Sequence, residues 1–180
     1  MKTECAGAEI PARVADIDWS RWVPTERATL LFVIRDGNIL LIEKKTGLGA
    51  GKINGPGGRI EEGETPLECA LREVEEEVCV TPLDATPAGE LRFQFRDGYA
   101  LHGYVFRAED CRGEARATRE ATPRWEPLDR LPFERMWPDD PLWFPYLLAR
   151  QPFEGRFIFD GDRMLDAVVT GTEDGSAGGA

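Results

Sequence analysis

The segment from Gly58 to Val80, GRIEEGETPLECALREVEEEVCV, restricts the fold more than any other part of the chain, because helix-start signals precede an amphipathic pattern in it. Thr65 is a good N-cap, Pro66 suits the first helical position, and Glu68 completes a capping box with Thr65. At about 100° per residue, the apolar side chains that follow share one arc and can face a core. These apolar side chains are Leu67, Ala70, Leu71, Val74 and Val78.

The carboxylates of Glu73, Glu76 and Glu77 project from another side of this predicted helix. Like charges this close repel one another unless a proton or a divalent cation neutralises them. Carboxylate oxygens suit Mg²⁺ or Mn²⁺, so this side of the helix is a candidate site for a hard cation. The alternative is a solvated acidic face with ordinary ion pairs such as Glu68–Arg72.

The same segment resembles the Nudix box, whose pattern is G-x5-E-x7-R-E-U-x-E-E-x-G-U, with U a bulky apolar residue. In the family the penultimate glycine ends the helix, but this chain has Cys79 there. The cysteine removes no ligand, and it predicts a different helix exit or modest strain. The resemblance implies an α/β fold, the Nudix α/β/α sandwich with a mixed β-sheet between helices. The matching positions are Gly58, Glu64, Arg72, Glu73, Val74, Glu76, Glu77 and Val80.

The resemblance also implies metal-dependent hydrolysis of a phosphoanhydride bond. Bound Mg²⁺, or Mn²⁺ as a substitute, would bridge a triphosphate and lower the pKa of the attacking water. Either Glu76 or Glu77 would orient or deprotonate that water. Glu64 and Arg72 complete the implied catalytic set, Arg72 by orienting a glutamate. The implied metal ligands are Glu73, Glu76, Glu77, a backbone carbonyl near Gly58, and Glu120.

Net charge limits the partners that this chain can have. At −11 it disfavours a nucleic-acid polymer or an anionic membrane, since either would require a basic surface. A small anionic nucleotide is still allowed where metal ions and a few local cations bridge it. With 180 residues, 42% of them hydrophobic, the chain can bury one sizeable core, which predicts one domain. We separately expect a monomer or weak homodimer.

Cysteine usage and the N-terminus favour a cytoplasmic protein with reduced thiols. The four cysteines show no CxxC spacing, and with His102 as the single histidine there is no zinc-binding pattern. The chain starts without a basic-then-apolar leader, and no apolar stretch approaches the roughly 20 residues that span a bilayer.

Composition divides the chain into three parts. Residues 1–25 form an N-terminal extension, in which Trp19 and Trp22 can anchor onto the body of the protein. Residues 26–170 form the predicted hydrolase domain, and residues 171–180 are small, polar and expected to be disordered.

Turn signals predict hairpins within the domain, and proline predicts a second helix. This helix covers residues 141–150, with Asp140 as its N-cap and Pro141 at its first position, although Pro145 in its interior weakens the prediction. The predicted hairpins pair residues 27–35 with 38–45, 90–96 with 99–107, and 153–159 with 164–169, and residues 123–127 form a further strand.

Beyond the box, the chain resembles the MutT-like branch of the family, the 8-oxo-dGTP diphosphatases and mammalian-type enzymes that remove oxidised purine nucleoside triphosphates. The resemblance covers about Thr29 to Val169 and is carried by residues 44–58, the box, residues 93–95 and residues 136–145. It implies cleavage to a monophosphate and pyrophosphate, which sanitises the nucleotide pool and so serves DNA repair. The implied substrate-binding residues are Asn54, Asp139 and Asp140 on the purine edge, Trp137 as a stacking surface, Phe93 in the pocket wall, Lys44 on the phosphates, and Thr29.

Several of these residues have simpler alternatives. An aspartate pair before Pro141 suits helix capping alone, Trp137 suits a core, and Asn54 suits a turn. Within the family, ADP-ribose, dinucleotide polyphosphates and coenzyme A are alternative substrates. A catalytically silent domain that only binds nucleotides is a further alternative, supported by Cys79 and opposed by the full carboxylate set.

Overall fold

The computed structural model describes residues 10–172, which fold around a mixed β-sheet. Within these residues the eight-stranded sheet has the order β10-β9-β5-β6-β1-β2-β3, with β8 paired to β2, and β4 and β7 form a separate pair. The strands are β1 (Glu26–Arg35), β2 (Asn38–Lys44), β3 (Ile53–Asn54), β4 (Thr81–Leu83), β5 (Thr86–Phe95), β6 (Ala100–Ala108), β7 (Asp110–Arg112), β8 (Ala121–Pro127), β9 (Phe153–Asp160) and β10 (Arg163–Gly171). The helices are α1 (Pro66–Val78) and α2 (Asp140–Leu148), with short 3-10 turns at Val14–Asp16 and Phe133–Arg135.

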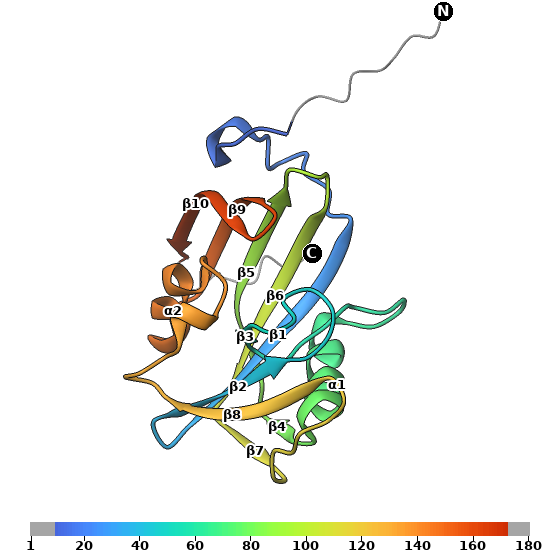
Figure 1. The fold of residues 1–180 in the computed structure, drawn as a ribbon, viewed down its shortest axis with the longest axis vertical. Helices are drawn as coiled ribbons and strands as arrows, with labels where there is room; N and C mark the ends of the chain where they lie inside the picture. The colour runs from blue at the N-terminus through green and yellow to red at the C-terminus, as the bar shows by residue number, and fades with distance from the viewer. Residues whose placement is uncertain (1–9, 173–180) are drawn as a thin grey trace, which may run out of the picture.

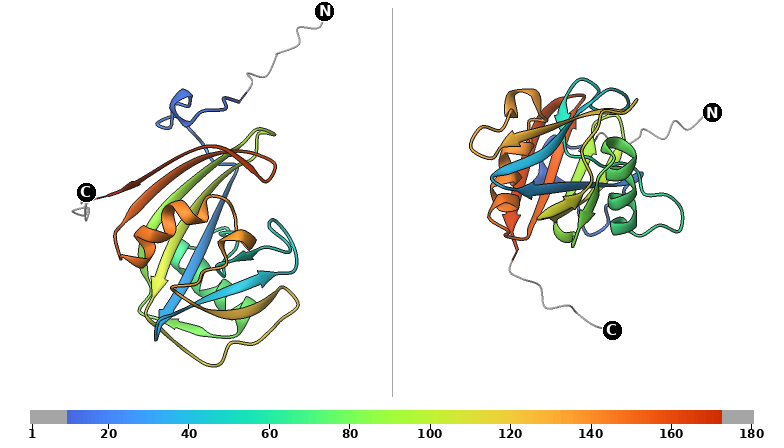
Figure 2. Two further views of the ribbon diagram at one scale, coloured as in Figure 1. Left: turned by 60° about the vertical axis from the view of Figure 1, so that its left-hand side comes forward. Right: turned by 90° about the horizontal axis from the view of Figure 1, so that it is seen from below.

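Helices α1 and α2 cover opposite faces of the sheet (Figures 1 and 2). Side chains of a strand alternate between faces, and β1 shows this division directly. Phe32 packs in the cluster that contains Trp143 of α2, whereas Leu31 and Val33 pack in the cluster that contains Val74 of α1. The expected α/β fold, with a mixed sheet between two helices, is confirmed.

In the predicted hairpin of residues 27–35 and 38–45, the two strands pair with each other only next to the turn. Strands β1 and β2 pair only at Ile34–Ile39 and Arg35–Asn38, next to the Asp36-Gly37 turn. Beyond that point β1 pairs in parallel with β6, and β2 pairs with β8. The prediction of a full hairpin was therefore wrong, because partners distant in the sequence replace the local one. The other two hairpins, β5–β6 and β9–β10, are confirmed.

Helix α1 begins as the sequence predicts. The Thr65 hydroxyl accepts a hydrogen bond from the Glu68 N–H, and the Glu68 carboxylate accepts one from the Thr65 N–H, which completes the capping box. The suggested Glu68–Arg72 pair is not formed, since Arg72 bonds Glu64 instead. Cys79 ends the helix at φ 63° and ψ 27°, a left-handed conformation, and donates its N–H to the Glu75 carbonyl. Cys79 therefore adopts the left-handed backbone conformation that glycine usually adopts at the end of a helix, but it carries a side chain.

Replacing Cys79 with glycine is expected to raise the free energy of unfolding by about 1 kcal/mol, because a β-carbon is disfavoured in the left-handed region. The side chain is exposed, so its loss removes little packing. Urea denaturation under reducing conditions measures the change. Cys79→Ser keeps the β-carbon and should leave the stability unaltered, and an equal gain in both variants would contradict the backbone explanation.

Helix α2 starts one residue earlier than predicted, which corrects the assignment of Asp140 as N-cap. Asp139 is the N-cap, Asp140 is the first helical residue, and neither carboxylate bonds the exposed N–H groups of the helix start. The helix ends at Leu148 rather than at residue 150, because Arg150 adopts φ 57°. The prediction from capping alone thus does not account for the two aspartate side chains.

Part of the N-terminal extension contacts the sheet, as its tryptophans predict. Trp22 Nε1 donates to Gln94 Oε1 at 2.9 Å, and the Val14 N–H donates to Asp166 at 2.8 Å. Residue Gly171, which we assigned to a disordered tail, is the last residue of β10, since it pairs with Phe153. Residues 1–9 and 173–180 lie outside the described part of the chain. Neither helix in residues 10–172 is long and apolar enough to cross a bilayer.

Candidate active site

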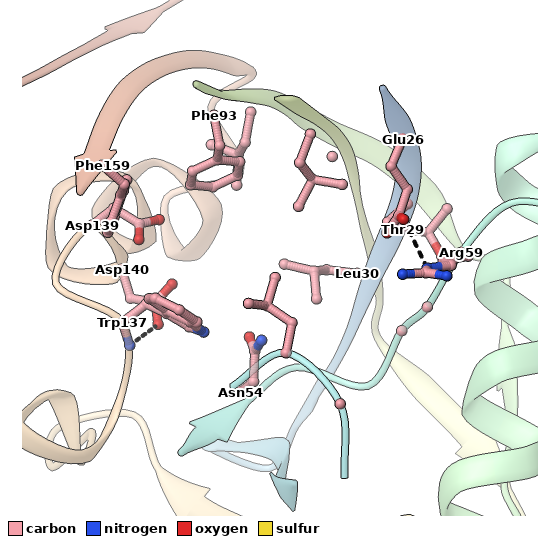
Figure 3. A pocket seen from close by; sticks show the side chains of 18 of the residues that line it. Glu26, Thr29, Leu30, Asn54, Arg59, Phe93, Trp137, Asp139, Asp140 and Phe159 are labelled. Carbon is pink, nitrogen blue, oxygen red and sulfur yellow. Dashed lines mark hydrogen bonds and ion pairs between the residues drawn. The ribbon is translucent and has the colours of Figure 1, made fainter. Parts of the chain in front are cut away.

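A cavity of about 470 Å³ opens on the α2 side of the sheet, between β1, β5 and β6, the Gly-rich loop and the start of α2. Figure 3 shows Asp139, Asp140 and Trp137 on one side of it and Glu26 and Arg59 on the other. The floor of the cavity is mainly apolar, so the polar side chains at its ends are desolvated. Such side chains can fix the orientation of a ligand and select among ligands by their hydrogen-bonding groups. The floor consists of Ala28, Leu30, Leu91, Phe93, Phe95, Leu101, Gly103 and Phe159.

Two buried aspartates form one end of the cavity. Asp139 and Asp140 are each 2% exposed, although both line the cavity. Asp139 Oδ2 accepts a hydrogen bond from Trp143 Nε1 at 3.0 Å, and Asp140 Oδ2 accepts one from the Trp137 N–H at 3.0 Å. Burial raises the pKa of Asp139 to about 6, and burial together with the Asp139 charge raises the pKa of Asp140 well above its ordinary value. The pair therefore retains a proton more readily than ordinary aspartates do.

The other residues expected to contact a base reach the same cavity. Asn54 of β3, Trp137 and Phe93 of β5 all line it. The Asn54 side-chain oxygen accepts from the Gly55 N–H at 2.8 Å, so its amide nitrogen can face a ligand. Trp137 is partly buried and meets Phe159 edge to face, with ring centroids 5.9 Å apart. The fold thus brings these three side chains, which come from separate segments of the sequence, to one cavity.

The three predicted glutamates of α1 differ in environment. Glu77 is 2% exposed, accepts a hydrogen bond from the Gly57 N–H at 2.9 Å, and lies 4.0 Å from Lys44 Nζ. Burial raises the pKa of Glu77 to about 7 and also raises the pKa of Glu73. Glu76 is 57% exposed and accepts a hydrogen bond from Arg72 at 3.1 Å. Two carboxylates are therefore desolvated next to Gly57 and Gly58, which line the cavity, and one remains in solvent.

Arg72 connects the predicted catalytic residues. Its guanidinium donates to Glu64 at 2.8 and 2.9 Å, to Glu73 at 2.8 Å and to Glu76 at 3.1 Å. The bonds from Arg72 hold the pKa of Glu64 down to about 2. Arg72 therefore fixes the orientation of Glu64 and Glu73 rather than reaching into the cavity.

The donor set on α1 is chemically suited to a divalent cation. Gly58 has no side chain where a Cβ would overlap the Glu73 carboxyl group, so this backbone lies directly against that carboxylate. The Thr118 hydroxyl donates to the Glu77 carbonyl at 2.9 Å, and the Lys45 N–H donates to the Glu120 carbonyl at 2.8 Å, so the loop that carries Glu120 runs beside the end of α1. In residues 10–172 no three acidic, His or Cys side chains already stand at ligand spacing, and Arg72 pairs with both Glu73 and Glu76. Exposed Glu76 can move toward its neighbours, so the residues present fit such an ion.

Thr29 and Lys44 both line the cavity, but they face different partners. The Thr29 hydroxyl lies 3.3 Å from the Cys69 thiol of α1, and the Thr29 N–H donates to the Gly58 carbonyl at 2.9 Å. Thr29 thus joins β1 to the box segment, and its hydroxyl is already in contact with the protein. Lys44 borders the cavity beside Glu77, where a cationic side chain can face an anionic group.

Sequence reasoning missed several cavity residues. Glu26 lines the far end, where it accepts from the Tyr99 hydroxyl at 2.9 Å and pairs with Arg59 at 2.8 Å. Trp143, which orients Asp139, was also missed. Strand alternation alone would have placed Glu26 and Leu30 on one face, because they lie an even number of residues apart. The Trp143–Asp139 bond had a weaker signal, the four-residue spacing on one helix.

Comparisons with known proteins identify relatives of this chain. The NUDIX domain model matches residues 24–147 of the chain. A Danio rerio protein named oxidized purine nucleoside triphosphate hydrolase is 40% identical over 138 residues, which are 76% of this chain and 88% of that protein. The Mus musculus protein of the same name is 39% identical over 139 residues, covering 76% of this chain and 89% of its own.

Among solved structures, a MutT protein from Bacillus halodurans superposes with a TM-score of 0.72 at 25% identity. The match covers 80% of this chain and 97% of the bacterial one. Since it extends over nearly the whole bacterial chain, the arrangement of sheet and helices described above is shared.

Proposed function

Because this chain belongs to the Nudix hydrolase family, we propose that it hydrolyses oxidised purine nucleoside triphosphates, such as 8-oxo-dGTP, to the monophosphate and pyrophosphate. The relatives named oxidized purine nucleoside triphosphate hydrolase support this substrate class. The observation that carries the proposal is the buried pair Asp139 and Asp140, which faces a cavity together with Asn54 and Trp137.

The base end of the cavity supports recognition of a purine edge. A protonated Asp140 donates a hydrogen bond and an ionised Asp139 accepts one, while Asn54 offers either kind of group. Oxidation at C8 turns the purine N7 from an acceptor into a donor, so it changes the pattern that such a site reads. Trp137 offers a flat apolar surface for the ring.

Next to Gly57 and Gly58 of the cavity wall, the residues of α1 support the hydrolytic step. Nudix hydrolases use divalent metal ions, and we assign Mg²⁺ here to Glu73, Glu76 and Glu77, with the Gly58 carbonyl and Glu120 assisting. When bound, the metal would neutralise the triphosphate and lower the pKa of the attacking water. Arg72 holds Glu73 in place through a 2.8 Å bond, and Lys44 of β2, which lines the cavity, would face the phosphates.

The hydrolase domain in this proposal spans residues 26–170, beyond the end of the family match at residue 147. Strand β9 pairs in parallel with β5 along Gly89–Phe95, so it belongs to the same sheet. Cys69, Cys79 and Cys111 are free thiols, which suits a reducing cytoplasm and a role in cleansing its nucleotide pool. We propose a monomer or weak homodimer without a nucleic-acid polymer as partner.

The test is pyrophosphate or phosphate release with Mg²⁺ from 8-oxo-dGTP, dGTP, 2-hydroxy-dATP, ADP-ribose and diadenosine tetraphosphate at equal low concentration. Preference for an oxidised purine is the expected result. Preference for ADP-ribose or the dinucleotide would retain the hydrolase and overturn the assignment of the base pocket. No turnover of any substrate would instead identify a domain that only binds nucleotides.

A further inference from the structure

The Gly-rich loop that follows β2 wraps around the indole ring of Trp137. Gly47 and Leu48 line the same cavity as this ring. Gly49 adopts φ 80°, and a Cβ added there would lie 3.0 Å from Trp137 Nε1. The Lys52 N–H donates to the Gly49 carbonyl at 2.9 Å, which turns the chain back at this point. The loop thus passes the Nε1 edge of the ring at Gly49 before it reaches Lys52.

Lys52 covers one face of the same indole. Its Nζ lies 4.8 Å from the centroid of the Trp137 ring and 3.0 Å from Asp162 Oδ2, in the turn between β9 and β10. Trp137 lines the cavity, but Lys52 and Asp162 are not among the lining residues. The ring thus borders the cavity, whereas the ammonium group that lies over the ring belongs to a residue outside the cavity lining.

A cation over an aromatic face has two physical consequences. The ring quadrupole attracts the charge, so the contact restrains the orientation of the ring. The charge also draws π-electron density toward itself, which leaves the opposite face better suited to an electron-rich base. Asp162 keeps the ammonium in place, and Phe159 supports the ring with an interplanar angle of 82°.

We propose that Lys52, held by Asp162, is a positioning residue that fixes and polarises Trp137 as the stacking surface for the purine. The inference rests on the proposed function, because it takes the cavity face of Trp137 as the surface that meets the base. Lys52 acts through the ring and does not itself touch the substrate.

Lys52→Met keeps most of the side-chain length and removes the charge. It is expected to raise KM for 8-oxo-dGTP by roughly 3- to 10-fold with kcat nearly unchanged, since stacking acts equally on the bound substrate and the transition state. Lys52→Arg should restore KM, because a guanidinium also binds an aromatic face. Asp162→Asn should raise KM by a smaller factor, because Asp162 is 71% exposed and its ion pair is screened.

A double-mutant cycle with Trp137→Ala tests whether Lys52 acts through the ring. Without the indole, Lys52→Met should have no further effect on KM. Arg116→Met is the matched control, since it removes one charge from an exposed ion pair with Glu114 and should leave KM unaltered. An equal effect of Lys52→Met in both backgrounds would overturn the proposal and would assign Lys52 a direct contact with substrate or a role in loop folding.

Calorimetric titration with 8-oxo-dGMP separates this inference from the proposed function, because it needs no turnover. Weaker binding by Lys52→Met than by the unaltered protein, with the same melting temperature, supports the inference. Equal binding by both proteins overturns the inference alone. No binding by the unaltered protein overturns the proposed purine site and, with it, the role of Lys52.

Discussion

Glu77→Gln is expected to lower kcat for Mg²⁺-dependent hydrolysis of 8-oxo-dGTP by roughly 100- to 1,000-fold, the scale for removing one electrostatic contact to a transition state. Glu77 is 2% exposed and accepts a hydrogen bond from the Gly57 N–H at 2.9 Å. Glutamine can still accept that bond, so the local backbone should be retained. It brings no charge to hold a cation, however, and the loss should persist at saturating Mg²⁺.

The same substitution is expected to stabilise the metal-free protein at about pH 8 by about 2–3 kcal/mol. Burial raises the pKa of Glu77 in the folded protein from the ordinary 4.5 to about 7, so ionisation disfavours the folded state. This penalty is absent below about pH 4.5, grows as pH rises, and is complete above about pH 7. Urea denaturation at these pH values, with a chelator present, should show the two proteins converging in acid.

Glu75→Gln is the matched control on the same helix. Glu75 is exposed and accepts a hydrogen bond from the Thr81 hydroxyl at 2.6 Å, away from the cavity. Its replacement should leave kcat for 8-oxo-dGTP unaltered. If Glu77→Gln keeps the unaltered kcat, the Glu77 carboxylate holds no catalytic cation and the metal site lies elsewhere on the helix.

The elements predicted correctly are those with complete local signals. Helix α1 has its N-cap, its proline and its capping glutamate within four consecutive residues, Thr65 to Glu68, so no distant contact is needed to specify its start. The turn at Asp36-Gly37 was equally clear, but it could not specify the partners of β1 and β2. Strand β1 pairs with β6, more than sixty residues along the chain, and the turn sequence contains no information about that pairing.

In the candidate site, too, the local sequence predicts where a residue lies but not which distant side chains it contacts. Asp139 and Asp140 precede Pro141, a pattern that helix capping also favours. The local sequence therefore predicts that both residues lie at the start of a helix, but it does not predict which way their side chains point. Burial and the bond from Trp143 decide the direction in the fold. The contact of Lys52 with Asp162 joins a loop and a turn over a hundred residues apart, and no short-range pattern predicts it.

Asp140→Asn is expected to lower kcat/KM for 8-oxo-dGTP by roughly 10- to 100-fold, because a hydrogen bond to a buried charged or polar group contributes about 1–3 kcal/mol. Burial and the nearby Asp139 charge raise the pKa of Asp140, so the unaltered pair holds a proton that it loses as pH rises. The kcat/KM of the unaltered protein should therefore fall at high pH. The asparagine variant cannot lose that proton, and its profile should be flatter. Activity measured from about pH 6 to pH 9 tests both expectations.

Stability distinguishes a titrating pair from one that merely begins a helix. Burial raises the pKa of Asp139 from the ordinary 3.8 to about 6, so folding is favoured by protonation and stability should fall as pH rises between these values. Asp139→Asn should remove that part of the pH dependence, whereas Asp129→Asn, at an exposed position, should retain it.

If Asp140→Asn instead leaves the pH profile of kcat/KM unaltered and lowers stability at every pH, the pair serves the helix and not the base. Selectivity between 8-oxo-dGTP and dGTP would then depend on Asn54 and Trp137 alone.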